Sequence, residues 1–160
     1  DLVAEVHAFG VPTVEITGGE PLLQPAAHAL MADLLALGHT VLLETSGSLS
    51  IAAVPPQVHV ILDLKPPDSG EEAANDWSNL DLLAPHHEVK IVVASRGDYE
   101  WARGVVARFG LAGRCPVLLS PAWGLVMPAD LARWILDDRL PVRLGIQLHK
   151  VVWNPDARGV

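Results

Sequence analysis

Short apolar runs recur along the chain, and longer segments with helical spacing of apolar residues separate several of them. The runs have the length and the β-branched content of strands. They cover residues 11–17, 40–44, 58–63, 88–93, 116–119 and 142–148. Helical patterns cover residues 1–9, 25–37, 99–109 and 128–137. Strands that alternate with helices predict an α/β fold with a parallel sheet, either open or rolled into a barrel.

Helix boundaries carry their own sequence signals. Pro25 suits a first turn and Gly38 follows the expected end, while Asp98 is a candidate N-cap for a helix that Gly110 would stop. The helix over residues 1–9 has no strand before it. We therefore expect a single domain over residues 1–160 whose first strand is missing, as in a chain shortened at its N-terminus.

Composition narrows the function classes. The chain has 160 residues, 11 basic against 19 acidic, and a net charge of −8 without a basic cluster, which argues against nucleic-acid binding. No apolar run approaches a membrane span and no basic segment opens a signal peptide. The single cysteine, Cys115, excludes an intrachain disulfide and fits the reducing cytoplasm.

Polar motifs follow the ends of the predicted strands. Because the carboxyl ends of parallel strands converge on one edge, these motifs predict a single site there. They are residues 17–20, 44–47, 63–67, 120–123 and 147–150.

The first motif is the most informative. Gly18 and Gly19 leave backbone groups bare at a strand end, and the Glu20 carboxylate beside them suits the amine of a zwitterionic ligand. An ordinary turn is the alternative. In the second motif, Glu44 and Ser46 suit ribose hydroxyls or a heterocyclic amino group, although Ser46 also suits turn backbone.

The later motifs add charged and aromatic candidates. Alternation puts Asp63 and Lys65 on one face, where they pair or where Lys65 meets a carboxylate or ribose oxygen. Alternation likewise puts Gln147 and His149 on one face, and His149 is suited to donating to a substrate or moving a proton. Trp123 suits stacking on an adenine or ordinary packing.

Taken together, these motifs resemble the radical S-adenosylmethionine superfamily, and within it the 7-carboxy-7-deazaguanine synthase family. The resemblance spans nearly the whole chain and is most specific in its Gln-Leu-His-Lys ending. It rests on residues 17–24, 44–48, 63–67, 90–93, 119–121, 147–153 and 154–160.

The resemblance implies a partial, modified β/α barrel that forms a homodimer. It implies S-adenosylmethionine, a [4Fe-4S] cluster and Mg²⁺ as cofactors, and a reductant such as flavodoxin. The implied reaction converts 6-carboxy-5,6,7,8-tetrahydropterin to 7-carboxy-7-deazaguanine with loss of ammonia, a step toward queuosine. A 5′-deoxyadenosyl radical would abstract hydrogen from the pterin before the ring contracts.

The resemblance also implies roles for individual residues. The substrate-facing residues would be Thr17, Glu44, Gln147 and His149, with Glu44 and His149 catalytic. The cofactor-binding residues would be Gly18, Gly19, Glu20, Ser46, Asp63, Lys65, Ser120, Pro121, Ala122 and Trp123.

One departure from the family pattern concerns activity. In the family, the three cysteines that hold the cluster, and the Mg²⁺ ligand, lie near the N-terminus beyond the first strand, and they have no counterpart here. We expect this chain by itself to hold no cluster and to be inactive, as a truncated chain or an incomplete gene model. Another radical S-adenosylmethionine enzyme, such as an activase, and a cluster-free ligand-binding module are the alternatives.

Overall fold

A parallel sheet forms the centre of the molecule. The computed structural model describes residues 2–153, and within them six strands pair in sequence order, every neighbouring pair parallel. The strands are β1 (Thr13–Ile16), β2 (Thr40–Thr45), β3 (His59–Asp63), β4 (Glu88–Val93), β5 (Val117–Pro121) and β6 (Arg143–Leu144). The α/β class and the parallel sheet are confirmed.

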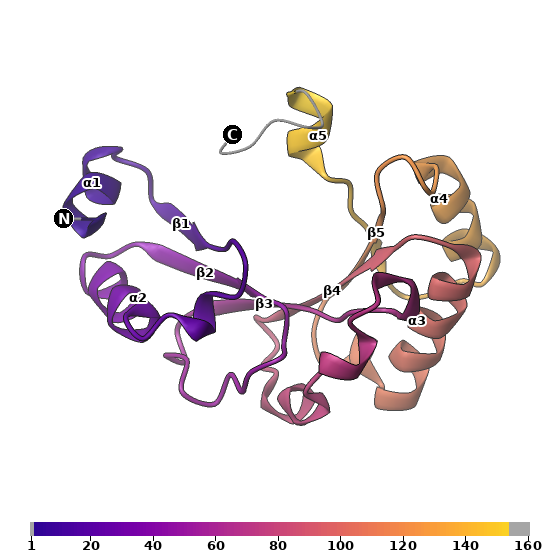
Figure 1. Ribbon diagram of the computed structural model, residues 1–160, viewed down its shortest axis with the longest axis horizontal. Coiled ribbons are helices and arrows are strands. Elements are labelled where there is room, and N and C mark those ends of the chain that lie inside the picture. The colour runs from indigo at the N-terminus through magenta and orange to yellow at the C-terminus, as the bar shows by residue number, and fades with distance from the viewer. Residues whose placement is uncertain (1, 154–160) are drawn as a thin grey trace.

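The order of the strands explains where the helices lie. Right-handed crossovers that always advance to the next strand place their helices on one face of a sheet. The helices α2 (Ala27–Ala36), α3 (Arg96–Phe109) and α4 (Pro128–Asp137) lie on the outer side of the arched sheet (Figure 1). The sheet is not a closed barrel, and α1 (Leu2–Ala8) and α5 (Leu148–Val152) flank its concave side.

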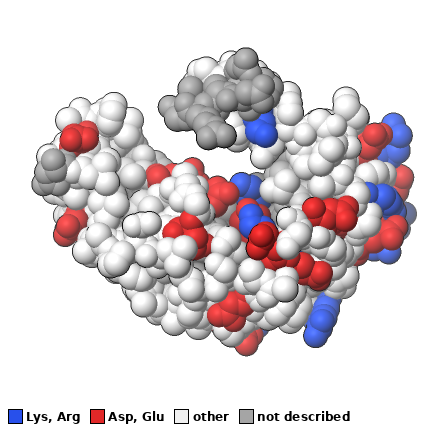
Figure 2. All heavy atoms as spheres, in the orientation of Figure 1, with Lys and Arg blue, Asp and Glu red and all other residues white. Residues whose placement is uncertain are grey.

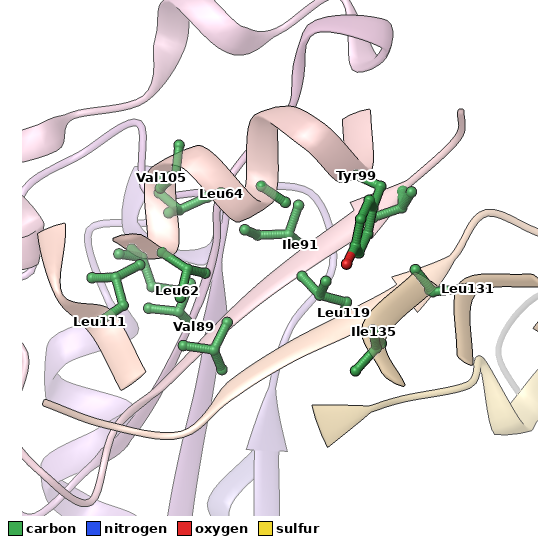
Figure 3. Close-up of a cluster of buried hydrophobic side chains, with 14 of the residues drawn as sticks. Leu62, Leu64, Val89, Ile91, Tyr99, Val105, Leu111, Leu119, Leu131 and Ile135 are labelled. Carbon is green, nitrogen blue, oxygen red and sulfur yellow. The ribbon is translucent and has the colours of Figure 1, made fainter. Parts of the chain in front are cut away.

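Along each strand, alternate side chains face the helices, where the core lies, and the concave side, where the candidate site lies. Buried residues such as Val41 and Leu43 on β2, or Val89 and Ile91 on β4, face the helices. Their neighbours Leu42, Glu44 and Lys90 are only partly buried, and they face the concave side. The larger core cluster fills the space between β3–β5 and helices α3 and α4 (Figure 3). A second cluster joins β1–β3 to α2.

The predicted start of α3 was wrong by one turn. The helix begins at Arg96, and its N-cap is Ser95, whose hydroxyl accepts a hydrogen bond from the backbone N–H of Asp98. Asp98 is buried, and its carboxylate accepts instead from the backbone N–H groups of Asp68 and Ala94. Its carboxylate therefore connects two loops and does not cap the helix.

The predicted last strand was also too long. Pairing with β5 stops at Leu144, and the chain turns into helix α5 at Leu148. The alternation that placed Gln147 and His149 on one strand face does not hold, and Leu148 is 61% exposed. The family-like ending, residues 154–160, lies outside the described residues.

Candidate functional site

Side-chain hydrogen bonds tie together the loops at the carboxyl ends of the first four strands. Asn79, in the 3-10 helix η4 (Trp77–Leu82), binds backbone groups of Gly47, Leu49 and Ile51 after β2. Asn75 and Asp98 make further contacts of this kind. Just after β3, the Asn75 side chain accepts a hydrogen bond from the backbone N–H of Lys65 and donates one to its backbone C=O. The Asp98 carboxylate accepts from the backbone N–H groups of Asp68 and Ala94, and so connects their two loops.

Glu20 connects the first loop to the second. Its carboxylate accepts hydrogen bonds from the Thr45 hydroxyl, from the backbone N–H and hydroxyl of Ser46, and from the backbone N–H of Leu22, at 2.5–3.0 Å. Burial alone would raise the pKa of Glu20, but these hydrogen bonds outweigh it and lower the pKa below its ordinary value. Both oxygens are therefore occupied by protein donors, which differs from the free acceptor that the sequence suggested.

Two lysine–carboxylate pairs lie on the concave face. Lys65 Nζ donates to Asp63 Oδ2 at 2.8 Å, which confirms the predicted proximity of these two residues. Lys90 Nζ donates to Glu44 Oε1 at 2.6 Å. Sequence reasoning gave Lys90 no role, although its place on a strand between apolar residues was a usable signal. Burial would lower the pKa of Lys90, but the bond to Glu44 raises it above its ordinary value.

These pairs line a cavity of about 390 Å³ whose walls include Glu44, Asp63, Lys65, Lys90 and Gln147. Acidic and basic atoms gather near the centre of this face, where the surface is hollowed (Figure 2). Two residues of this lining each have a buried oxygen that makes no hydrogen bond within residues 2–153, Asp63 Oδ1 and Gln147 Oε1. Burial raises the pKa of Asp63, with Lys65 opposing the shift. Buried acceptors without partners are costly, so they suit a ligand with N–H or O–H donors.

An apolar cavity of about 500 Å³ adjoins the polar one. It is lined by Trp123, Met127, Ile146 and Gln147, among others, and Gln147 borders both cavities. Trp123 is 48% exposed, so its ring is available to a flat ligand.

The backbone is unusually close to β5 at Gly145. A Cβ placed on Gly145 would lie 2.7 Å from Ser120 Oγ. Ser120 is therefore buried against Gly145, and Pro121 and Ala122 lead from it into the two cavities.

Not all the predicted site residues meet. Thr17 and Gly18 line a different cavity, of about 460 Å³, against α1 and α2. Gly18 and Gly19 both have positive φ, 94° and 58°, so the first loop requires glycine there. His149 is exposed on α5 and is not among the residues that line the polar cavity.

The residues present do not fit an iron–sulfur cluster. Cys115, the single cysteine of the sequence, is buried just before β5, at the amino edge of the sheet and opposite the candidate site. Burial raises the pKa of its thiol, which disfavours the thiolate that iron requires. Within residues 2–153, no group of three or more His, Cys, Asp or Glu side chains is placed to hold a metal ion.

The described helices are too short or too polar to cross a membrane. Comparison with family models gives no match. Among solved structures, the fold is similar to QueE from Escherichia coli, with a TM-score of 0.67 and 24% identity over 92% of this chain and 62% of that one. It is also similar to Streptococcus suis SuiB bound to S-adenosylmethionine, with a TM-score of 0.62 and 14% identity over 99% of this chain and 44% of SuiB. These likenesses concern the fold.

Curated relatives are more informative. The chain is 47% identical to 7-carboxy-7-deazaguanine synthase of Chlorobaculum tepidum, over all of this chain and 74% of that protein. It is 46% identical to the Koribacter versatilis enzyme of the same name, over 92% of this chain and 71% of the relative. Identity at this level, sustained over the whole α/β sheet and its site loops, makes the chain a member of the 7-carboxy-7-deazaguanine synthase family.

Proposed function

We propose that the two adjoining cavities bind the substrate and the cofactor of a 7-carboxy-7-deazaguanine synthase. The substrate is 6-carboxy-5,6,7,8-tetrahydropterin, and the products are 7-carboxy-7-deazaguanine and ammonia. The observation that carries the proposal is the pair of unsatisfied buried acceptors, Asp63 Oδ1 and Gln147 Oε1, on two residues that line the same cavity as Glu44. A reduced pterin has a row of N–H donors that matches such acceptors.

The roles follow the contacts. Glu44 and Gln147 would accept hydrogen bonds from the pterin amino and ring N–H groups. Lys65, held at the mouth of the β3 loop by Asn75, would meet the carboxylate of S-adenosylmethionine or its ribose oxygens. Trp123, in the apolar cavity, would stack on the adenine. When bound, S-adenosylmethionine supplies the radical chemistry of its superfamily.

Other roles remain predictions that the geometry supports less directly. Gly18 and Gly19 would present bare backbone to the cofactor, and Glu20 and Ser46, which hydrogen-bond each other, would bind it beside them. His149 would face the pterin, as the resemblance implies. The Mg²⁺ requirement, the homodimer, the flavodoxin-like reductant and the cytoplasmic location also stay predictions.

Calorimetry on the chain tests the proposal. We expect 6-carboxypterin, a stable analogue, to bind the unaltered chain and to bind Glu44→Gln more weakly. We expect Lys65→Ala to weaken S-adenosylmethionine binding and to leave the pterin affinity closer to that of the unaltered chain. The absence of binding of both ligands to the folded chain would contradict the proposal.

A further inference from the structure

Lys90 makes a contact that spans a strand. It lies on β4 and Glu44 lies on β2, and both strands pair with β3, which runs between them. Strands two apart in a sheet are separated by roughly 9–10 Å. Nevertheless Lys90 Nζ lies 2.6 Å from Glu44 Oε1, so the lysine stem extends over β3 on the concave face.

The bridge occupies one oxygen of Glu44. Lys90 donates to Oε1, and Oε2 makes no hydrogen bond among the described residues. The lysine and glutamate side chains are 22% and 25% exposed, so both are largely held by their surroundings. One oxygen of Glu44 is thereby fixed while the other stays available at the wall of the cavity.

The charges around the bridge favour this arrangement. Glu15 on β1 and Asp63 on β3 also act on the Lys90 ammonium, so three carboxylates surround one lysine. Burial and the nearby Glu44 raise the pKa of Glu15. Asp63 has its own partner in Lys65. Lys90 is therefore the group that compensates Glu44, and without it Glu44 would face Asp63 and Glu15 uncompensated.

We propose that Lys90 is a positioning residue for the substrate: by bridging over β3, it holds the Glu44 carboxylate with Oε2 open to the N–H donors of the pterin. This rests on the proposed function, because it concerns the same cavity. Lys90 itself points its ammonium at Glu44 and acts on the ligand through that carboxylate. The effect of losing Lys90 must therefore depend on the presence of Glu44.

A double-mutant cycle tests this dependence. The affinity for 6-carboxypterin is measured by calorimetry on the whole chain, as unaltered protein, Lys90→Met, Glu44→Gln and the double variant. We expect each single change to weaken binding roughly tenfold, as for loss of a charge-assisted hydrogen bond, and the double change to weaken it no further. Lys90→Arg should keep most of the affinity, since it can still donate to Oε1.

Two controls keep the result interpretable. Arg133→Met removes a cation from an exposed pair with Asp130 on α4 and should change neither the affinity nor the effect of Glu44→Gln. The ¹⁵N signal of the Lys90 ammonium in NMR spectra reports the bridge without any ligand, and we expect Glu44→Gln to shift it.

The outcomes separate the two proposals. If the unaltered chain binds 6-carboxypterin and Lys90→Met binds it equally well, the positioning role alone is overturned. The same holds if the affinity losses of the two single variants multiply in the double variant. No binding by the unaltered chain would overturn the proposed function and the positioning role with it. Persistence of the NMR shift in that case would show that the bridge exists but serves another purpose than holding a pterin.

Discussion

The Glu20 carboxylate accepts two hydrogen bonds from Ser46, one from its backbone N–H at 2.8 Å and one from its hydroxyl at 2.5 Å. Glu20 follows β1 and Ser46 follows β2, so one side chain fixes the relative position of two strand-exit loops. Glu20 is thus a structural connection between the two loops, and its contact with a ligand amine stays a prediction.

Glu20→Gln should lower the stability of the folded chain by about 1–2 kcal/mol at pH 7, since a carboxamide accepts fewer hydrogen bonds and the group is partly exposed. The folded pKa of Glu20 lies below its ordinary value of 4.5, so its contribution is present above that pH and is lost as the pH falls through the folded pKa. Thermal midpoints from pH 7 to pH 3 should show the two proteins converging. Glu100→Gln, at an exposed position on α3, serves as the control.

Gly19 has φ 58°, a conformation that asparagine tolerates and valine does not. Gly19→Asn should fold with little loss of thermal midpoint but should weaken S-adenosylmethionine binding, because its side chain occupies the space before the bare backbone. Gly19→Val should both lower the thermal midpoint and weaken S-adenosylmethionine binding. Unchanged affinity in a folded Gly19→Asn would mean that the loop only makes a turn.

Gly145→Ala should destabilise the chain by about 1–3 kcal/mol through overpacking. The new Cβ would stand 2.7 Å from Ser120 Oγ and 3.2 Å from Leu118 Cδ2. Adding Ser120→Ala removes the nearer of these atoms and should restore part of the loss. Gly104→Ala, where a Cβ meets nothing within 4 Å inside α3, should instead stabilise the helix in the same denaturant titration.

Leu148→Ala should be nearly neutral, whereas Leu119→Ala should cost about 2–5 kcal/mol. Leu148 is 61% exposed on α5, and Leu119 is fully buried on β5 within the larger core cluster. Chemical denaturation of both variants checks the pair. A loss for Leu148→Ala as large as that for Leu119→Ala would require a contact that residues 2–153 do not contain.

Acidification should destabilise the chain through His87. Burial, with the nearby rings of His86 and His59, lowers the pKa of His87 from 6.5 to about 4. Its Nδ1 accepts a hydrogen bond from the backbone N–H of Ala84, which a protonated ring cannot do. Between about pH 6.5 and pH 4 the unfolded chain binds the extra proton, so stability falls as the pH falls.

His87→Gln should flatten this dependence in thermal midpoints measured from pH 7 to pH 4.5. His149→Gln, which removes an exposed imidazole on α5, serves as the control. An unaltered slope in His87→Gln would assign the acid sensitivity to other groups.

Periodicity predicted the sheet well because burial on the helix-facing side imposes strict alternation, as on β2 and β4. It failed after Leu144, where alternation continues in the residues without a strand to pair with. The residues Ile146 and Leu148 are exposed, so their apolar character reflects something other than a core position. Alternation alone cannot distinguish a paired strand from an unpaired segment.

Position at a strand end placed only part of the candidate site together. Glu44, Asp63 and Lys65 line one cavity, which Gln147 also lines although β6 ends at Leu144, whereas Thr17 and Gly18 line another. The bridge from Lys90 was missed because it depends on a neighbour two strands away, which no local pattern encodes. Asp98 was misassigned because an N-cap and a buried loop acceptor share the same residue preferences.

The loop contacts have a consequence for motion. Glu20 links the first loop to the second, Asn79 and Asn75 lie on one short segment that holds the second and third, and Asp98 links the third to the fourth. Amide hydrogens in these four loops should therefore exchange with deuterated solvent at similar rates, as one cooperative opening unit rather than as independent turns. A graft that replaces one of these loops would break bonds in its neighbours, so they must be exchanged between proteins as a set.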